Sequence, residues 1–131
     1  MIDTSVLVAG LVAEHEFHRL ARPEIRKTDL VSGVVLAETF AQLRRTFRLS
    51  VEVTHAVLQP WITDSDRVAV LSPRGYVELF GQSTQLRLGG NIHDAVIAKT
   101  AGEIGQELVT LDRRQHAIAL ALGVPATCLA D

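Results

Sequence analysis

Short apolar runs alternate along the chain with longer segments whose apolar residues recur at helical spacing. The short runs are candidate strands, and each intervening segment is long enough for one or two helices. This alternation is typical of a parallel sheet whose strands are joined by crossover helices on both faces. The candidate strands are Met1–Asp3, Leu30–Ser32, Val68–Leu71, Leu108–Leu111 and Ala126–Leu129.

Two of the predicted helices carry an acid in an informative position. In residues 34–48, one apolar stripe follows steps of four, three and four, and Glu38 lies off this stripe at the start of a polar strip. In the predicted helix 92–103, Asp94 shares a face with the apolar residues Ile97 and Ala101. The spacing therefore turns the Asp94 carboxylate toward the core, where an anion without partners is costly.

Proline and glycine delimit the remaining helices. Residues 51–63 form a predicted helix that Pro60 kinks or stops near its end. A further helix starts at Pro73–Gly75 and runs to Arg87, where Gly89-Gly90 closes it with a turn. Gly123–Pro125 ends the last helix before the terminal strand.

Length and composition indicate a folded globular protein with one domain spanning residues 1–131. Hydrophobic residues make up 47% of the chain and charged residues 21%, as in globular proteins. A formal net charge of -2 excludes a histone-like protein that coats nucleic acid by charge alone. Of the 13 basic residues only Lys27 and Lys99 are lysine, so the rest are arginine, which suits phosphate but also reflects biased genomic composition.

The chain is expected to be soluble and cytoplasmic. Its single cysteine, Cys128, has no partner for an internal disulfide, which favours a reducing compartment and a buried free thiol. No N-terminal stretch has the order of a secretory signal, and no run approaches the roughly 20 apolar residues of a membrane span.

Four acidic residues stand where an apolar run ends or a helix begins: Asp3, Glu38, Asp94 and Asp112. Each has a structural explanation of its own, because Asp3 and Asp112 suit helix N-caps, Asp94 completes a capping pattern with Asn91, and Glu38 suits a solvated helix face. Three of the four lie at strand ends or in first helical turns, which is where ligand sites form in open parallel sheets. Gathered carboxylates repel by about 4 kcal/mol per pair at ~4 Å and an effective dielectric of about 20, so such a cluster calls for Mg²⁺ or Mn²⁺.

Other candidates for chemistry are weaker. His15 and His18 are three residues apart, but a surface helix face is favoured over a metal site because no third ligand is apparent. His93 beside Asp94 is either a proton-transfer group or a solvated side chain. Cys128 lacks a paired base in sequence. No glycine-rich phosphate loop, Cys-x-x-Cys pair or serine elbow is present.

The acidic motifs together resemble a known family. They are Asp3-Thr-Ser5 before an apolar run, Ala37-Glu38 on an early helix, Asn91-Ile-His-Asp94-Ala95 opening a late helix, and Val109-Thr-Leu-Asp112 after a strand. In this order and at this chain length, they look like PIN-domain ribonucleases, and the most similar group is the VapC-type toxins of bacterial toxin-antitoxin pairs. The resemblance covers nearly the whole chain.

The resemblance implies a three-layer α/β sandwich, in which helices flank a parallel sheet of about five short strands. It implies a Mg²⁺- or Mn²⁺-dependent endoribonuclease that cleaves structured RNA, such as transfer or ribosomal RNA. It also implies inhibition by a small antitoxin of the VapB type, in a homodimer or a toxin-antitoxin hetero-oligomer.

The resemblance also assigns roles by position. Asp3, Glu38, Asp94 and Asp112 become the catalytic acids, and the first, third and fourth of these the metal ligands. Ser5 and Thr110 become polar supports for a carboxylate or a metal-bound water. The weaker candidates for RNA contacts are the arginines Arg45, Arg48, Arg113 and Arg114.

The chain departs from the family pattern at three points. Only Met1 and Ile2 precede Asp3, so either the first strand is short or the chain starts late within it. Ser5 stands where asparagine is common. Arg113 and Arg114 follow Asp112, so a fifth acidic ligand is not predicted.

Two other functions are considered. One is a non-catalytic PIN-like module that binds RNA or protein, which the four intact acids disfavour. The other is a phosphoacceptor domain, which would need an acidic pair on the first strand and a late-strand lysine that the sequence lacks.

Overall fold

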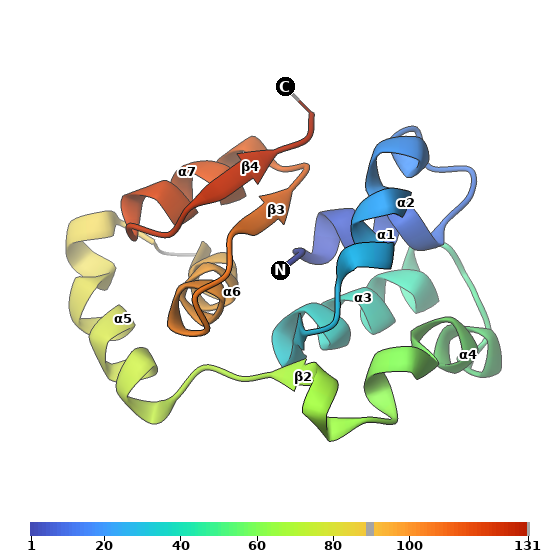
Figure 1. Ribbon diagram of the computed structural model, residues 1–131, viewed down its shortest axis with the longest axis horizontal. Coiled ribbons are helices and arrows are strands. Elements are labelled where there is room, and N and C mark those ends of the chain that lie inside the picture. Colours follow the sequence, from blue (N-terminus) through green and yellow to red (C-terminus); the bar gives the residue numbers. More distant parts are fainter. Residues whose placement is uncertain (89–90, 131) are drawn as a thin grey trace.

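A computed structural model describes residues 1–88 and 91–130, so the predicted Gly89-Gly90 turn lies outside the described residues. The fold is α/β, with short parallel strands among helices (Figure 1). In chain order the elements are α1 (Thr4–Leu11), α2 (His18–Lys27), β1 (Val31–Ser32), α3 (Gly33–Arg45), α4 (Val51–Ile62), η1 (Ser65–Arg67), β2 (Val68–Ala69), α5 (Pro73–Leu86), α6 (Ile92–Glu103), β3 (Leu108–Thr110), α7 (Arg113–Ala121) and β4 (Ala126–Cys128).

The strands are shorter than predicted and form two parallel pairs within the described residues. β1 pairs with β2, and β3 pairs with β4. The predicted first strand is reduced to one parallel bridge between Ile2 and Val109. It cannot extend further, because the Asp3 side chain accepts a hydrogen bond from the Val6 amide and starts α1 there. The N-terminus consequently lies beside β3, between β3 and α1 in Figure 1.

The predicted helix 34–48 ends earlier than expected, at Arg45. The chain leaves the helix through Thr46 and Phe47, and Arg48 adopts a left-handed conformation with φ of 55°. The Leu49 amide then donates to the Leu43 carbonyl at 3.0 Å, which closes the end of the helix. Pro60 does not stop α4, which ends two residues later at Ile62. A proline this close to the C-terminal end disturbs few helical hydrogen bonds.

The core is centred on α1 and α6. Four consecutive residues of α1, Val6 to Ala9, are at most 3% exposed, so α1 is buried all round rather than on one stripe. Trp61 is buried in the same core. Full burial of one of the valine or leucine side chains of α1 stabilises the fold by roughly 1.5–3 kcal/mol. The buried helices therefore hold Asp3 and Asp94, at their N-terminal ends, in fixed places.

Within the described residues, no helix combines the length and the apolar character needed to cross a membrane.

Candidate acidic site

All four predicted acids line one hollow of about 370 Å³. Asp3 comes from the start of α1, Glu38 from the middle of α3, Asp94 from the first turn of α6 and Asp112 from the start of α7. Elements that are distant in sequence thus bring their carboxylates to a single opening. The four were predicted as a group, and the fold places them as a group.

Asp3 lies deepest and is held by hydroxyl and amide groups. It is 4% exposed, and its Oδ1 accepts hydrogen bonds from Ser5 Oγ at 2.6 Å and from the Val6 amide at 3.1 Å. Its Oδ2 accepts a hydrogen bond from Thr110 Oγ1. Ser5 and Thr110, the two predicted supports, therefore contact the same carboxylate, one from α1 and one from the end of β3.

The Ser5 and Thr110 hydroxyls also accept hydrogen bonds from backbone amides of the segment that follows β3. Ser5 Oγ accepts from the Leu111 amide at 3.0 Å, and Thr110 Oγ1 accepts from the Asp112 amide at 2.9 Å. These contacts tie the start of α1 to the segment between β3 and α7. The relative positions of Asp3 and Asp112 are consequently determined by two hydroxyl groups.

Burial raises the pKa of Asp3 from 3.8 to about 6. The hydrogen bonds from Ser5, Thr110 and Val6 act in the opposite direction, and the nearby charge of Asp112 adds a further increase. An upward shift of this size means that the ionised carboxylate costs about 3 kcal/mol of folding free energy at neutral pH. The fold thus maintains an unfavourable anion at the bottom of the hollow.

Asp94 also has a raised pKa, chiefly through partial burial and then through repulsion by Glu38 and Asp112. The positive charge of Arg114 and His93 lowers it in part. The Asp94 backbone is held from the opposite side, because the buried Gln115 of α7 donates its amide to the Asp94 carbonyl at 3.0 Å. Asp94 is therefore close enough to the other two acids for their charges to repel its carboxylate.

The side chains of Glu38 and Asp112 are also ordered by hydrogen bonds. Thr4 Oγ1 donates to Glu38 Oε1 at 2.6 Å, which joins α1 to α3. Asp112 Oδ1 accepts from the Arg114 amide at 2.8 Å and so caps α7. Capping is therefore the local role of Asp112, as it is of Asp3. At α6, Asn91 occupies the N-cap position but its side chain makes no capping hydrogen bond.

The donor set fits a divalent cation in its chemistry. Within the described parts of the chain, no three Asp, Glu, His or Cys side chains form a ready-made metal cluster. Mg²⁺ does not require one, because it commonly binds through one or two carboxylates and keeps several waters. The carboxylates of Asp3, Asp94 and Asp112 are the oxygen ligands that this ion prefers, and a cation would relieve the repulsion that raises the pKa of Asp94.

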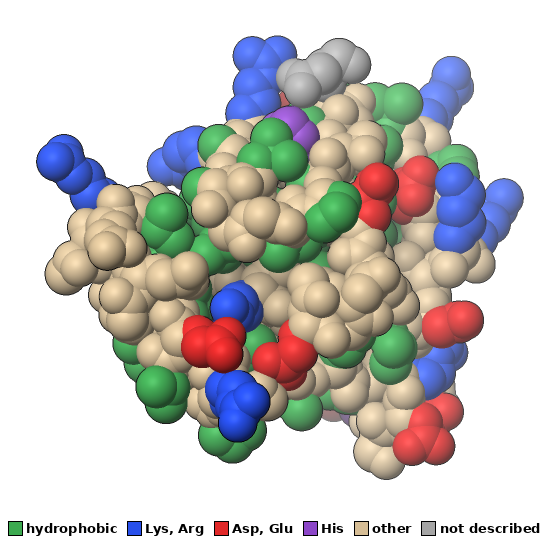
Figure 2. Space-filling view, turned by 60° about the vertical axis from the view of Figure 1, so that its left-hand side comes forward, with side chains coloured by type: hydrophobic (Ala, Val, Ile, Leu, Met, Phe, Trp, Pro, Cys, Tyr) green, Lys and Arg blue, Asp and Glu red, His purple; other side chains and the backbone are tan. Residues whose placement is uncertain are grey.

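The four arginine candidates lie in different surroundings. Arg45 lines a second hollow of about 490 Å³, which shares Glu38 and Gln42 with the acidic one. Arg48 is exposed after the end of α3, and Arg113 and Arg114 are exposed at the start of α7. Arg114 Nε lies 4.0 Å from Asp112 Oδ1. Figure 2 shows acidic and basic side chains interspersed over one face, without an extended patch of either sign.

Sequence reasoning missed several residues that line or support the site. Thr4, His15, Phe17 and Gln42 all line the acidic hollow, and Gln115 supports the backbone of Asp94. The preference for placing His15 on a surface helix face was wrong, because His15 lies in the turn between α1 and α2. For Thr4 the signal was its position directly after Asp3. For His15 and Phe17 no local signal exists, since the path of the turn decides where they point.

Comparison with known proteins identifies the family. The chain matches the PIN domain over residues 1–120, which is most of its length. It therefore belongs to the PIN-domain family. It is 32% identical over 117 residues to "Ribonuclease VapC40" of Mycobacterium tuberculosis, in the strains CDC 1551 / Oshkosh and ATCC 25618 / H37Rv. Each alignment covers 86% of this chain and 85% of the relative, so the chain is of the VapC type.

Proposed function

We propose that this protein is a divalent-metal-dependent endoribonuclease that acts as a toxin on structured cellular RNA, such as transfer or ribosomal RNA. The observation that supports the proposal most is the convergence of four carboxylates from α1, α3, α6 and α7 on one hollow. The similarity to proteins named as ribonucleases agrees with it.

Asp3, Asp94 and Asp112 would hold the cation, and Glu38 would complete the acidic set. Mg²⁺ or Mn²⁺, when bound, lowers the pKa of water and neutralises charge at the phosphorus. The chain's own hydroxyl groups have a positioning role. Ser5 and Thr110 hold the Asp3 carboxylate through both of its oxygens, and Thr4 holds Glu38. This preorganisation keeps the acids in place before substrate arrives.

Asp94→Asn provides the direct test. Purified protein is incubated with total cellular RNA, with and without added Mg²⁺ or Mn²⁺, and the cleavage sites are mapped by sequencing of the RNA ends. We expect cleavage by the wild type that depends on the metal, and a loss of at least about 100-fold in Asp94→Asn, because an anionic ligand is removed. Asp66→Asn in η1 is the matched control, since this exposed acid lies outside the hollow.

Two results would contradict the proposal. Equal cleavage by Asp94→Asn and wild type would exclude the acidic hollow as the active site. RNA binding without cleavage under any metal condition would instead favour the non-catalytic binding module.

A cognate antitoxin of the VapB type is the proposed partner. A separate, more apolar hollow of about 330 Å³ supports this part of the proposal. It is lined by residues near the end of α1 and from the region of α3 and α4: Leu11, Val12, Ala13, Glu14, Phe47, Leu49, Val53 and Val57. Val53 is 47% exposed, which leaves apolar surface for a partner to cover. Co-expression with the product of the neighbouring gene, followed by co-purification, tests the pairing and shows whether a homodimer or a hetero-oligomer forms.

A further inference from the structure

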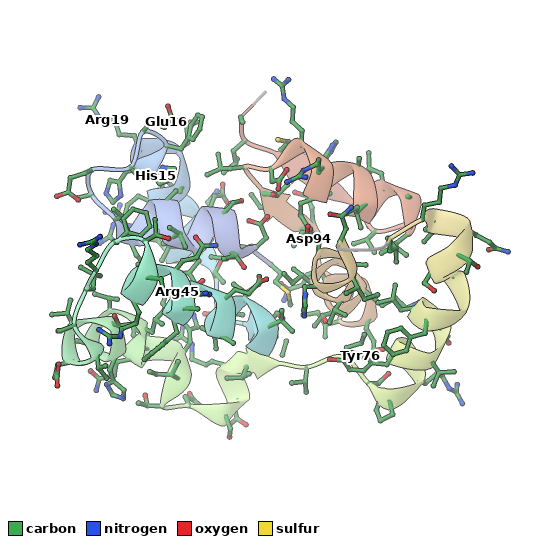
Figure 3. The ribbon with its side chains drawn as sticks, turned by 180° about the vertical axis from the view of Figure 1, so that it is seen from behind. His15, Glu16, Arg19, Arg45, Tyr76 and Asp94 are labelled. Atoms are coloured by element: carbon green, nitrogen blue, oxygen red, sulfur yellow. The ribbon has the colours of Figure 1, made fainter. Side chains whose placement is uncertain are left out.

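Two aromatic side chains line the acidic hollow without belonging to the acidic set. His15 and Phe17 come from the turn between α1 and α2, and both are half-buried. In Figure 3, His15 and Asp94 lie well apart, so the aromatic pair occupies a different end of the site from the first turn of α6. Among the described residues, His15 belongs to no group of three His, Cys, Asp or Glu side chains that could hold a metal ion, so a role for it as a ligand beside Asp94 and Asp112 is not supported.

The turn presents these side chains in a fixed arrangement. The Phe17 amide donates to His15 Nδ1 at 3.1 Å, and the His18 amide donates to the His15 carbonyl at 3.0 Å. The Phe17 carbonyl accepts from the Ala21 amide at 3.0 Å, which anchors the turn to α2. Phe17 also packs against the main core. The two rings therefore do not have to be ordered when a ligand arrives, which reduces the entropic cost of binding.

The hydrogen bond to Nδ1 also determines the tautomer of neutral His15. Because Nδ1 accepts a hydrogen bond from the Phe17 amide, the ring proton of the neutral imidazole is on Nε2. His15 consequently offers one hydrogen-bond donor. The rings of His15 and Phe17 have centroids 6.1 Å apart and are tilted by 40°, so they present an apolar surface and a donor side by side.

We propose that His15 and Phe17 form a subsite for one unpaired nucleobase next to the scissile phosphate. Unpaired RNA bases stack on aromatic side chains and are read through hydrogen bonds to their edges. A base is neutral, so the nearby carboxylates do not repel it as they would repel a phosphate. Phe17 would supply the stacking surface, and His15 Nε2–H would donate to a carbonyl oxygen or ring nitrogen of the base.

The subsite rests on the proposed RNA substrate and adds sequence preference to it. The acidic end contacts the phosphate, which is the same in every nucleotide, and carries no information about the base. A fixed donor and a stacking surface favour bases with an acceptor at the matching edge. The cleavage sites in cellular RNA should therefore share a preferred base at one position beside the cut.

The test removes one base at a time from the substrate. Short oligoribonucleotides containing the mapped cleavage sequence are prepared with an abasic ribose at each position flanking the cut. Removal of the stacked base should lower kcat/KM of the wild type by about 5- to 150-fold at one position. In Phe17→Leu the same removal should change kcat/KM by less than about threefold, because the stacking contact is already absent. In His15→Ala the penalty for base removal should be smaller than in the wild type, because the hydrogen bond to the base is absent while stacking on Phe17 remains.

Two variants serve as controls. His15→Gln retains a side-chain donor and should restore part of the base dependence. Glu16→Gln lies in the same turn, but Glu16 is exposed and projects from the edge of the molecule in Figure 3. It should keep the full wild-type penalty for base removal. Thermal melts establish that Phe17→Leu is folded.

A binding measurement separates this inference from the proposed activity. An oligouridylate with 2-aminopurine at one position is titrated with protein in the presence of a chelator, and stacking is followed by quenching of its fluorescence. Quenching that Phe17→Leu lowers, without any cleavage in metal, supports the subsite and contradicts the nuclease. Cleavage whose base dependence is equal in wild type, His15→Ala and Phe17→Leu overturns the subsite and leaves the nuclease standing. The absence of both binding and cleavage overturns both.

Discussion

The acidic end and the aromatic end of the hollow are assembled in different ways. At the acidic end, α1, α3, α6 and α7 each contribute one carboxylate, and hydroxyl groups from α1 and β3 join them. At the aromatic end, His15 and Phe17 are two residues apart and share a direct hydrogen bond. The first arrangement depends on the packing of the whole fold, whereas the second depends on a single turn.

The two ends also differ in their contribution to the stability of the fold. The pKa of Asp3 is raised to about 6, so its ionised form opposes folding. No such opposition exists for Phe17, which packs on the core and stabilises the fold. Residues that serve charge chemistry therefore destabilise the fold that holds them, whereas an aromatic residue that contacts a base can contribute to binding and to folding stability at the same time.

Asp3→Asn should separate activity from stability most clearly. Asparagine keeps an acceptor for Ser5 and for the α1 cap, but it removes the buried anion. We expect metal-dependent cleavage to be lost, while urea denaturation of the metal-free protein shows an increase in stability approaching about 3 kcal/mol at pH 7. A lower stability of Asp3→Asn than of the wild type at pH 7 would contradict the conclusion that the buried Asp3 anion destabilises the fold.

The same pair of proteins gives a pH dependence with a definite sign. The folded-state pKa of Asp3 is raised, so the folded protein binds the proton more tightly than the unfolded chain does. The destabilisation of the fold by the ionised Asp3 carboxylate is therefore complete above about pH 6 and decreases as the pH falls toward 3.8. The stability difference between Asp3→Asn and wild type should shrink over that range, and a constant difference from pH 7 to pH 4 would contradict the assignment.

Thr110→Val tests whether hydroxyl groups hold the acidic end together. The change removes the donor to Asp3 and the acceptor of the Asp112 amide while keeping the side-chain shape. We expect a loss of about 1–3 kcal/mol of stability, and a fall in kcat at unchanged fold by circular dichroism. Thr127→Val on the neighbouring strand is the matched control, because Thr127 is exposed and bonds only Glu107 among the contacts described. Equal effects of the two changes would show that the Thr110 hydroxyl has no special role in the acidic site.

Arg45→Gln should give the smallest effect. Arg45 lines the hollow that adjoins the acidic one, whereas Arg48 lines neither. If Arg45 contacts an RNA phosphate, its loss should weaken RNA binding at low salt and reduce the slope of log K against log salt by about 0.7–1. Arg48→Gln should leave the slope near the wild-type value. The measurement is fluorescence anisotropy over a salt series with a labelled oligoribonucleotide.

Helices were predicted better than strands. The predicted helix 92–103 agrees with α6 at both ends, because its apolar face is continuous with no proline inside it. Met1–Asp3 was a poorer prediction, since the capping of α1 by Asp3 leaves a single bridge at Ile2. A strand needs a partner from elsewhere in the chain, and apolar sequence alone does not say how much of it will be paired.

The identity of the groups available for chemistry follows from local sequence alone. Three acids at element boundaries and a fourth, Glu38, within a helix make up a recognisable family motif, together with a serine near Asp3 and a threonine near Asp112. The caps made by Asp3 and Asp112 are local as well, because each joins residues at most three positions apart. Both features follow from hydrogen bonding and periodicity within short segments.

Only the tertiary structure decided how these groups combine. The pairing of Thr4 with Glu38, the contact of Thr110 with Asp3, and the position of His15 in the acidic hollow each join segments that packing brings together. The raised pKa of Asp3 has the same origin, because desolvation depends on every element packed around the carboxylate. Burial and long-range proximity are properties of the folded chain, and no short segment specifies them.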